Sequence, residues 1–429
     1  MRKIKLGDVL DVKRGASLSG EFYSEQGERI RLTLGNFKYP GGGFKENTSK
    51  KDIYFTGAIK PEFILKKGDI ITPLTEQVSG LLGETARVPK DDIYIQSGDI
   101  GLVIPNERAL DKDFAYYLVS SPVVKKQLDA AAQQTKIRHT SPDAIKACEA
   151  YLPELLEQKK IAALLDAING KIANNNAICA DLEGMAKLLY DYWFVQFDFP
   201  DENGKPYKSS GGKMVWNEEL KREIPEGWTV VSYRECIQSV NTGLNPRDNF
   251  KLNTGGNIRY LTVKNLTTSG NIDFASCDFI DDAARNIVHR RSDISIGDVL
   301  FASIAPLGRC FLIDEEPIDW DINESVFSIR PNYQRMTSKF LYMTFMGDSF
   351  IKKATNSSTG SVFKGIRIND LMEMKTILPP MSVLQYFDEK GEKLFATKSN
   401  CVAESVELTS MRDFLLPMLM NGQIKVKGA

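Results

Sequence analysis

The most regular feature of the chain is a long stretch in which apolar residues recur at alternating intervals of four and three. It runs without a slip from Ile161 to Trp193. The positions are Ile161, Leu165, Ile168, Ile172, Asn175, Cys179, Leu182, Ala186, Leu189 and Trp193. Such alternation is typical of a heptad seam rather than of a broad amphipathic face. We therefore expect one long helix, introduced by a Leu-Pro pair and on the order of 50 Å long at about 1.5 Å per residue.

A second long helix is expected after the segment "ILPPM" (377–381). One column of the seam recurs 226 residues later, at Phe387, Leu394, Cys401, Leu408 and Leu415. The other column is interrupted by Gly391, Lys398, Ser405 and Arg412. Two helices of equal length would most simply pack on each other. Asn175 would then be a polar residue within the seam, where it either fixes the register or marks a kink in "NGKIANNNAI".

The remaining segments predict short strands separated by Gly, Asp and Asn. The expected strands lie in residues 29–37, 52–57, 68–75, 93–104, 257–266, 297–304 and 325–331. One helix is expected over residues 111–134 and another over residues 337–355.

These elements recur in the same order in the two halves of the chain. "RLTLGNF" (31–37) matches "YLTVKNL" (260–266) at a shift of 229, and "GDIIT" from Gly68 matches "GDVLF" from Gly297. "YLPEL" (151–155) matches "ILPPM" at a shift of 226. The chain is therefore interpreted as a tandem duplication of a unit of about 200 residues, each with a β-rich part and a long helix.

Composition places few further limits. The 429 residues are 42% hydrophobic and 26% charged, which favours a globular protein of two or more domains. The absence of a signal sequence or of a long apolar run, together with six scattered cysteines, predicts a cytoplasmic protein with reduced thiols. The formal net charge of −1 argues mildly against DNA binding, which would need local basic patches.

Catalytic motifs are missing. The two histidines have no neighbouring ligands at zinc spacing, and no phosphate-binding loop or nucleophile elbow occurs. "YPGGGFKEN" (39–47) could cradle a phosphate but is better interpreted as a flexible hairpin tip. The acidic pairs at 91–92 and 281–282 fit turns. The pattern favours a binding and scaffolding protein.

Two segments resemble a known family. "LPELLEQKKIAALLDAINGKIANNN" (152–176) and "LLYDYWFVQFDFPDENGKPYKSSGGKMVWNEELKREIPEGW" (188–228) look like the central region of specificity subunits of type I restriction-modification systems, and "LLPMLMNGQIKV" (415–426) looks like their end. The resemblance covers the whole chain. The second Leu-Pro helix departs from it, having "SVLQ" (382–385) in place of "LLEQ" (155–158).

The resemblance implies an α+β fold with two tandem β-rich target-recognition domains, each followed by a long helix, and with the two helices pairing as an antiparallel coiled coil. The implied divisions are recognition domain 1 (1–150), spacer helix 1 (151–197), a connecting loop (198–226), recognition domain 2 (227–377) and spacer helix 2 (378–429). The chain itself would have no catalytic activity and bind no cofactor or metal. Its partners would be double-stranded DNA, two methyltransferase subunits and, in the full complex, restriction-translocase subunits.

In such a protein, loops and strand ends would contact DNA, with Lys and Arg holding phosphates. The candidates are Lys38, Tyr39, Lys45, Lys136, Arg138, His139, Lys264, Arg290, Arg291, Arg309, Lys364 and Arg367. Each of them could equally be a solvated surface residue. Asn36 and Asn265 occupy equivalent positions and are expected to be structural turn residues. Trp193, Phe194 and Phe197 would pack on the opposing helix or on a methyltransferase subunit.

Two other functions remain open at this point. One is an enzyme acting alone, which the missing motifs oppose. The other is a coiled-coil adaptor whose β-rich domains bind proteins.

Overall fold

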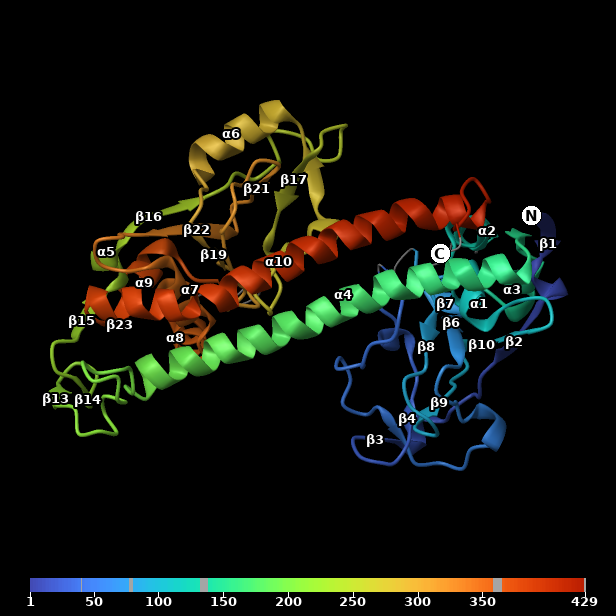
Figure 1. The fold of residues 1–429 in the computed structure, drawn as a ribbon, viewed down its shortest axis with the longest axis horizontal. Coiled ribbons are helices and arrows are strands. Elements are labelled where there is room, and N and C mark those ends of the chain that lie inside the picture. Colours follow the sequence, from blue (N-terminus) through green and yellow to red (C-terminus); the bar gives the residue numbers. More distant parts are fainter. Residues whose placement is uncertain (40, 77–79, 132–137, 358–364, 428–429) are drawn as a thin grey trace. The chain divides into compact units, whose positions relative to one another are not determined.

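A computed structural model describes residues 1–39, 41–76, 80–131, 138–357 and 365–427 (Figure 1). The chain divides into two units, one made of Met1–Asn174 with Glu404–Ala429 and the other of Asn175–Ala403. Each unit therefore contains one β-rich domain, part of the helix that follows it, and part of the helix of the other repeat.

In the first unit, the first and last strands of the domain pair with each other. The antiparallel ladder between β1 and β12 joins Arg2 to Leu152, so the two ends of the domain lie side by side. The strands are β1 (Arg2–Lys5), β2 (Leu10–Arg14), β3 (Tyr23–Ser24), β4 (Ile30–Arg31), β5 (Tyr54–Phe55), β6 (Ile70–Pro73), β7 (Thr75–Glu76), β8 (Ala86–Arg87), β9 (Tyr94–Ile95), β10 (Ile100–Pro105), β11 (Arg138–His139) and β12 (Glu149–Leu152). The helices are α1 (Lys112–Val119), α2 (Pro122–Ala131), α3 (Pro142–Ala147) and the first part of α4 (Leu155–Tyr190).

The domain of the second unit repeats this plan. The strands are β13 (Met214–Asn217), β14 (Arg222–Pro225), β15 (Thr229–Ser232), β16 (Ile237–Thr242), β17 (Ile258–Leu261), β18 (Asp278–Ile280), β19 (Val299–Ala302), β20 (Cys310–Leu312), β21 (Trp320–Ile322), β22 (Val326–Pro331) and β23 (Lys375–Leu378). The helices are α5 (Tyr233–Cys236), α6 (Asp282–Ser292), α7 (Ser338–Met346), α8 (Asp348–Ser357), α9 (Ile368–Glu373) and the first part of α10 (Met381–Met420).

The sheet topology confirms the duplication. The sheet order β2-β10-β6-β8 in the first domain has the counterpart β16-β22-β19-β20 in the second, and β1-β12 has the counterpart β15-β23. In both domains a parallel pair, β4-β9 or β17-β21, belongs to a second sheet, which is β3-β5-β4-β9 in the first domain and β18-β17-β21 in the second.

A glycine after the second strand is needed in both copies. Gly15 follows β2 and Gly243 follows β16. A Cβ atom on Gly15 would collide with the carbonyl oxygen of Ser97, and a Cβ on Gly243 would collide with that of Ile322. Only a residue without a side chain lets the two backbone segments approach this closely.

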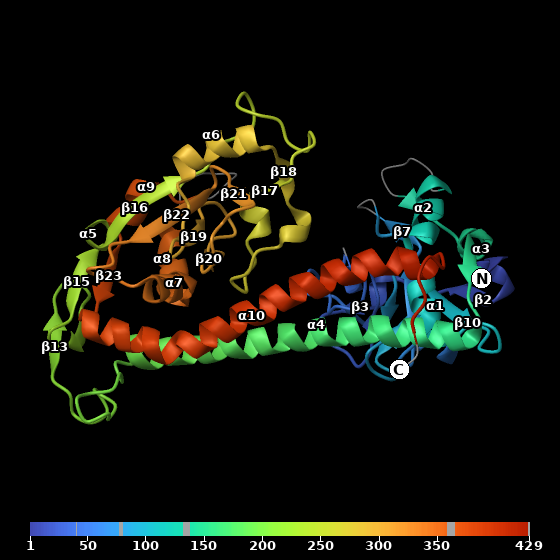
Figure 2. The ribbon, with the colours of Figure 1, turned by 45° about the horizontal axis from the view of Figure 1, so that its top comes forward.

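Within each unit, α4 and α10 run antiparallel. In the first unit the ion pair between Lys171 and Glu404 joins them at 3.1 Å. In the second unit the Asn175 amide donates to the carbonyl oxygen of Cys401 at 3.4 Å, and Tyr190 lies against Phe387. Higher residue numbers on one helix thus meet lower numbers on the other. Figure 2 shows α4 and α10 again from a second direction.

The heptad positions of α4 face inward as the spacing predicts. Ile161 and Leu165 are fully buried, and Asn175 is 1% exposed. The burial of Asn175 and its bond to α10 agree with a register function, and α4 continues through this point without a break. The three aromatic residues Trp193, Phe194 and Phe197 are buried in the core of the second unit, where Trp193 and Phe194 pack on Phe387 of α10.

Three expectations about local structure were wrong. The helix expected over 111–134 is two helices, because Pro122 has no N–H to continue the first and disfavours helical conformation in Ser121. The helix expected over 337–355 likewise breaks at Gly347. The segment 198–226, expected to be a loop, contains the β13–β14 hairpin, which is closed by the side chain of Asn217 accepting from two backbone N–H groups.

The helix α4 ends at Tyr190 and is followed by a π-helical turn, Asp191–Val195, whose aromatic contact with α10 is expected to be a main source of stability in the second unit. Phe387 is fully buried, and its ring centre lies 4.9 Å from that of Phe194. Phe387→Ala is expected to lower the free energy of unfolding by about 3–5 kcal/mol because it leaves a cavity. Urea unfolding of the purified chain measures this. Phe414→Ala, which truncates a 66% exposed ring of the same helix, is the control. Equal losses in the two variants would contradict the packing.

The neighbouring residue, Asp388, is expected to make stability depend on pH. Burial raises its pKa to about 6, although its side chain accepts a hydrogen bond from Thr337 Oγ1 at 3.0 Å. The folded state therefore holds this proton more tightly than the unfolded chain, whose carboxyl ionises near 3.8. The resulting stabilisation is present below about pH 4 and is lost as the pH rises through about 6.

Asp388→Asn keeps the hydrogen-bond acceptor and removes the charge. We expect the variant to exceed the natural chain in stability by about 1–2 kcal/mol at pH 8, a value reduced for the partial solvation of this half-buried group, and to match it at about pH 3.5. Chemical unfolding at the two pH values measures the difference. Glu389→Gln, at an exposed neighbour, should show no such pH dependence.

Candidate nucleic-acid interface

The Gly-rich segment of the first domain forms a hairpin. Phe37 and Phe44 pair as an antiparallel bridge, and the Lys38 N–H donates to the carbonyl oxygen of Gly43 at 2.9 Å. Lys38 and Lys45 are exposed, as is the ring of Tyr39. The structure thus brings these three candidates to one hairpin, with both lysines in contact with solvent.

The inner side of this hairpin rests on a buried carboxylate. The Gly43 N–H donates to Thr85 O at 2.8 Å, and the backbone of Gly42 lies against Glu84. Glu84 is 2% exposed, and burial raises its pKa even though Lys125 lies 2.5 Å away. Burial, and then the nearby Glu84, raises the pKa of Tyr39. Only the outer side of the hairpin is therefore suited to phosphate.

The second candidate group of this domain is differently placed. Arg138 contacts Glu76 at 2.9 Å and Asp129 at 2.6 Å, and hydrogen bonding to Asp129 raises its pKa. Glu76 is 1% exposed and also accepts from two backbone N–H groups at 81 and 82. Arg138 therefore balances a buried acid that lies 62 positions earlier in the chain, which sequence spacing does not reveal. His139 is exposed, whereas Lys136 lies outside the described residues.

The described candidates of the second domain lie in three different places. Lys264 pairs with Asp278 at 3.2 Å, and Arg309 donates to the carbonyl oxygen of Val263 at 3.1 Å, so these two lie near the same turn. Arg290 and Arg291 are exposed on α6. Arg367 is exposed just before α9, and Lys364 lies outside the described residues.

Asn36 and Asn265 have the same structural role. Both are buried, and each accepts at 2.9 Å from the backbone N–H of the threonine three residues earlier. Their amide groups donate in turn to backbone carbonyl oxygens, of Lys45 and Asp273 respectively. Since their hydrogen bonds are used within the turn, they hold its shape, as the sequence predicts.

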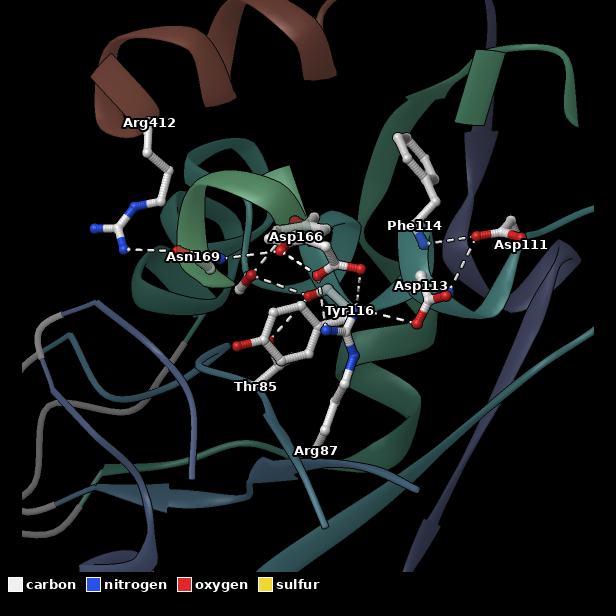
Figure 3. Close-up of polar contacts among 11 residues, drawn as sticks. Thr85, Arg87, Asp111, Asp113, Phe114, Tyr116, Asp166, Asn169 and Arg412 are labelled. Atoms are coloured by element: carbon white, nitrogen blue, oxygen red, sulfur yellow. Dashed lines mark hydrogen bonds and ion pairs between the residues drawn. The ribbon is translucent and has the colours of Figure 1, made fainter. Parts of the chain in front are cut away.

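A polar network that the sequence did not reveal fixes the first domain to the helices (Figure 3). The Arg87 guanidinium contacts Asp166 of α4 at 2.8 Å and Asp113 at 3.1 Å, and it lies over the ring of Tyr116. Asp166 also accepts from Tyr117 Oη at 2.6 Å, and burial followed by this bond raises the pKa of Tyr117.

The network continues from α4 to α10. Asn169 donates to Tyr117 Oη at 2.9 Å and accepts from Arg412 of α10 at 3.1 Å. Asp166 and Asn169 each follow a buried seam residue directly, which is the one sequence signal that could have indicated them. The domain, α4 and α10 are thus joined by charge-assisted hydrogen bonds.

In the second unit, another polar residue that interrupts the apolar column of α10 also joins the two helices and the domain. Lys398 of α10 pairs with Glu183 of α4 at 3.1 Å. Its ammonium group also donates to the carbonyl oxygens of Ser269 and Gly270 in the second domain, at 3.3 and 3.2 Å. Two of the four interruptions in this column of α10 therefore have a physical reason. Lys398 bonds to α4 and to the second domain, and Arg412 bonds to α4.

Among the described residues, no group of three or more His, Cys, Asp or Glu side chains is arranged to hold a metal ion. None of the helices described combines the length and apolarity that crossing a membrane requires.

Comparisons with known proteins agree on one family. The chain matches "Type I restriction modification DNA specificity domain" over residues 1–184 and again over 225–389. It is 25% identical over 337 residues to the type I restriction enzyme MjaIX specificity subunit of Methanocaldococcus jannaschii, covering 76% of this chain and 72% of that protein. It is 22% identical over 413 residues to the type I restriction enzyme HindI specificity subunit of Haemophilus influenzae, covering 84% and 87%.

A solved structure has a similar fold. It is the type I restriction-modification system S subunit from M. genitalium, with a TM-score of 0.56 and 16% sequence identity, and the match covers 98% of this chain and 96% of that one. At this identity the likeness concerns the fold. Together with the two matched segments, which cover most of the sequence, it gives the conclusion that the chain belongs to the family of type I restriction modification DNA specificity domains.

Proposed function

We propose that this chain is the DNA specificity subunit of a type I restriction-modification system, with no catalytic activity of its own. The observation that carries the proposal is the doubled family match within one chain, at residues 1–184 and 225–389. Two recognition modules in one chain suit a target made of two half-sites. The curated relatives that the chain matches are named as specificity subunits of restriction enzymes.

In this proposal residues 1–150 and 227–377 each recognise one half-site. The helices α4 and α10, at 36 and 40 residues, would span about 54 and 60 Å and set the gap between the half-sites. Two sets of contacts support this division of labour, since each holds a recognition domain to the paired helices of its own unit. They are the Arg87–Asp166 ion pair and the hydrogen bonds of Lys398 to the carbonyl oxygens of Ser269 and Gly270.

The same proposal assigns the partners. Two methyltransferase subunits would supply the chemistry, and restriction-translocase subunits would join them in the full complex. Double-stranded DNA would be held through phosphates by exposed cations such as Lys38 and Lys45, and read through base edges in the grooves. Arg138 contributes less in this scheme, because two carboxylates already surround its charge.

Exchange of one domain tests the bipartite assignment. Residues 1–150 are replaced by the corresponding domain of another family member, and the chain is co-expressed with its methyltransferase subunits. The new complex is expected to methylate sites in which one half has changed and the other half is retained. Sequencing of methylated bases in host DNA shows this. Methylation at unchanged sites, or no dependence of methylation on this chain, would contradict the proposal.

Removal of the two hairpin lysines tests the phosphate contacts. Lys38→Ala with Lys45→Ala is expected to weaken binding of all duplexes alike, because phosphates carry no sequence information. The slope of log K against log salt should fall by about 2, roughly 0.9 for each lost contact. Binding of the assembled methyltransferase at several salt concentrations gives the slope. The control is Lys146→Ala, whose ammonium group is occupied by Asp143 at 3.0 Å. An unchanged slope in the double variant would exclude the hairpin.

A further inference from the structure

The two domains differ in local structure at an equivalent segment. At the shift of 229, Phe37 corresponds to Leu266 and Gly68 to Gly297, so residues 38–67 and 267–296 connect the same elements with the same length of chain. In the first domain this segment contains the glycine hairpin, β5 and a short 3-10 turn at Pro61–Phe63. In the second domain it contains β18 and the eleven-residue helix α6. The shared scaffold thus carries two different local structures.

The inner face of α6 is firmly held. Ala284, Val288 and Ser292 are buried. Ser292 Oγ donates to the fully buried Asp321 at 2.6 Å, and His289 Nδ1 lies 3.1 Å from the other oxygen of the same carboxylate. Because one buried acid binds two successive inner positions, the helix is fixed in rotation about its axis.

Both ends of α6 are also defined. Asp281 caps the first turn by accepting from the Ala284 N–H at 2.8 Å, and Asp293 ends the helix in the left-handed conformation. Arg285 donates to the carbonyl oxygen of Pro317 at 2.7 Å. The helix can therefore present its outer side chains in fixed positions, as recognition of a base sequence requires.

The outer face of α6 has no partner within the part of the chain that is described. It consists of Ala283, Asn286, Ile287 and Arg290, all exposed, and Ile287 is 44% exposed. These positions share one stripe of the helix because they are three and four residues apart. Figures 1 and 2 both show α6 on the side of its domain that is turned away from α10. The stripe is thus accessible in its unit.

The residue types on this stripe match the chemistry of the DNA major groove. Arginine can donate two hydrogen bonds to guanine, asparagine can pair with adenine, and an apolar side chain can contact the methyl group of thymine. An α-helix fits the major groove, and the eleven residues span about 16 Å.

The charges on and around α6 indicate which part of the helix would lie close to DNA. Its last turn carries Arg290 and Arg291, and exposed Arg247 and Lys251 lie on the segment whose Phe250 and Leu252 pack in the same small core as α6. The first turn instead carries Asp281 and Asp282, which would repel phosphates. The second half of the helix is therefore the part suited to lie close to the DNA backbone.

We propose that α6 is the base-reading element of the second domain, with Asn286 and Arg290 hydrogen-bonding to base edges in the major groove and Ile287 contacting a thymine methyl group. His289, Ser292 and Asp321 are positioning residues, which hold the helix at the required rotation. The proposal rests on the proposed function, since it names the residues through which one recognition domain would select its half-site.

The test uses the full chain assembled with its methyltransferase subunits and a library of duplexes with randomised positions. Bound duplexes are sequenced, which gives the preferred base at every position of both half-sites. Arg290→Ala is expected to relax the preference at one base pair of a single half-site, and to weaken binding of the best duplex by roughly 5- to 150-fold. Asn286→Ala should act at a neighbouring base pair. The other half-site should be unchanged in both variants.

Two further variants make the result specific. Arg290→Lys keeps the positive charge but not the two-pronged donor, so it should relax the base preference as Arg290→Ala does. Arg234→Ala removes an exposed arginine of the same domain that pairs with Glu373 at 2.8 Å, and it should leave the selected sequence unchanged. Thermal unfolding of each variant shows whether the fold is kept, and these surface positions are expected to keep it.

The outcomes separate the two proposals. A selected sequence that is identical in Arg290→Ala, Asn286→Ala and the natural chain would overturn the assignment of α6, as would full rescue of Arg290→Ala by lysine, which indicates a phosphate contact. Failure of folded Arg290→Ala and Asn286→Ala chains to assemble with the methyltransferase subunits would overturn the assignment and show that α6 binds protein instead. If the natural complex selects no sequence at all, the proposed function itself fails.

Discussion

The burial of the seam between α4 and α10 is the constraint on which each unit depends. The first unit needs residues 404–429, and the second needs the last part of α4, so neither repeat completes its core from its own residues. Leu419 and Met420 lie in the core of the first domain, as Trp193 and Phe194 lie in the core of the second. Apolar burial of this kind favours the closed unit without directional contacts, and the polar contacts then decide the register.

Two of those polar contacts, made by Asn175 and Lys398, are largely buried. An asparagine in an apolar seam costs stability if its amide is unpaired, so the position of Asn175 opposite the Cys401 carbonyl disfavours a shifted register. The same reasoning applies to Lys398, which is 13% exposed and surrounded by Glu183 and two carbonyl oxygens. Removing one partner of such a group leaves a charge that water cannot reach, and this makes the docking of domain on helix specific.

Sequence spacing was sufficient for two features. The alternation from Ile161 to Trp193 predicted α4 through its local periodicity, and the segments matched at shifts of 226 and 229 residues predicted the duplication. Contacts between residues far apart in the sequence could not be predicted. Nothing near Arg87 indicates Asp166, and nothing near Arg138 indicates Glu76, because each pair is brought together by the sheets. Pro122 could have indicated the break between α1 and α2. It was missed because the apolar pattern on both sides of Pro122 is that of a single helix.

The first unit combines residues from the beginning and the end of the sequence, which affects when its core can form during translation. Domain 1 leaves the ribosome first, yet part of its core, including Leu419 and Met420, is made last. At 5–20 residues per second, the interval between residues 174 and 429 is on the order of 10–50 s. During that time the inward face of the new α4 has no α10 to cover it, whereas the second domain meets its part of α4 already made. Early termination of translation near the end of the chain would therefore damage the domain that was translated first.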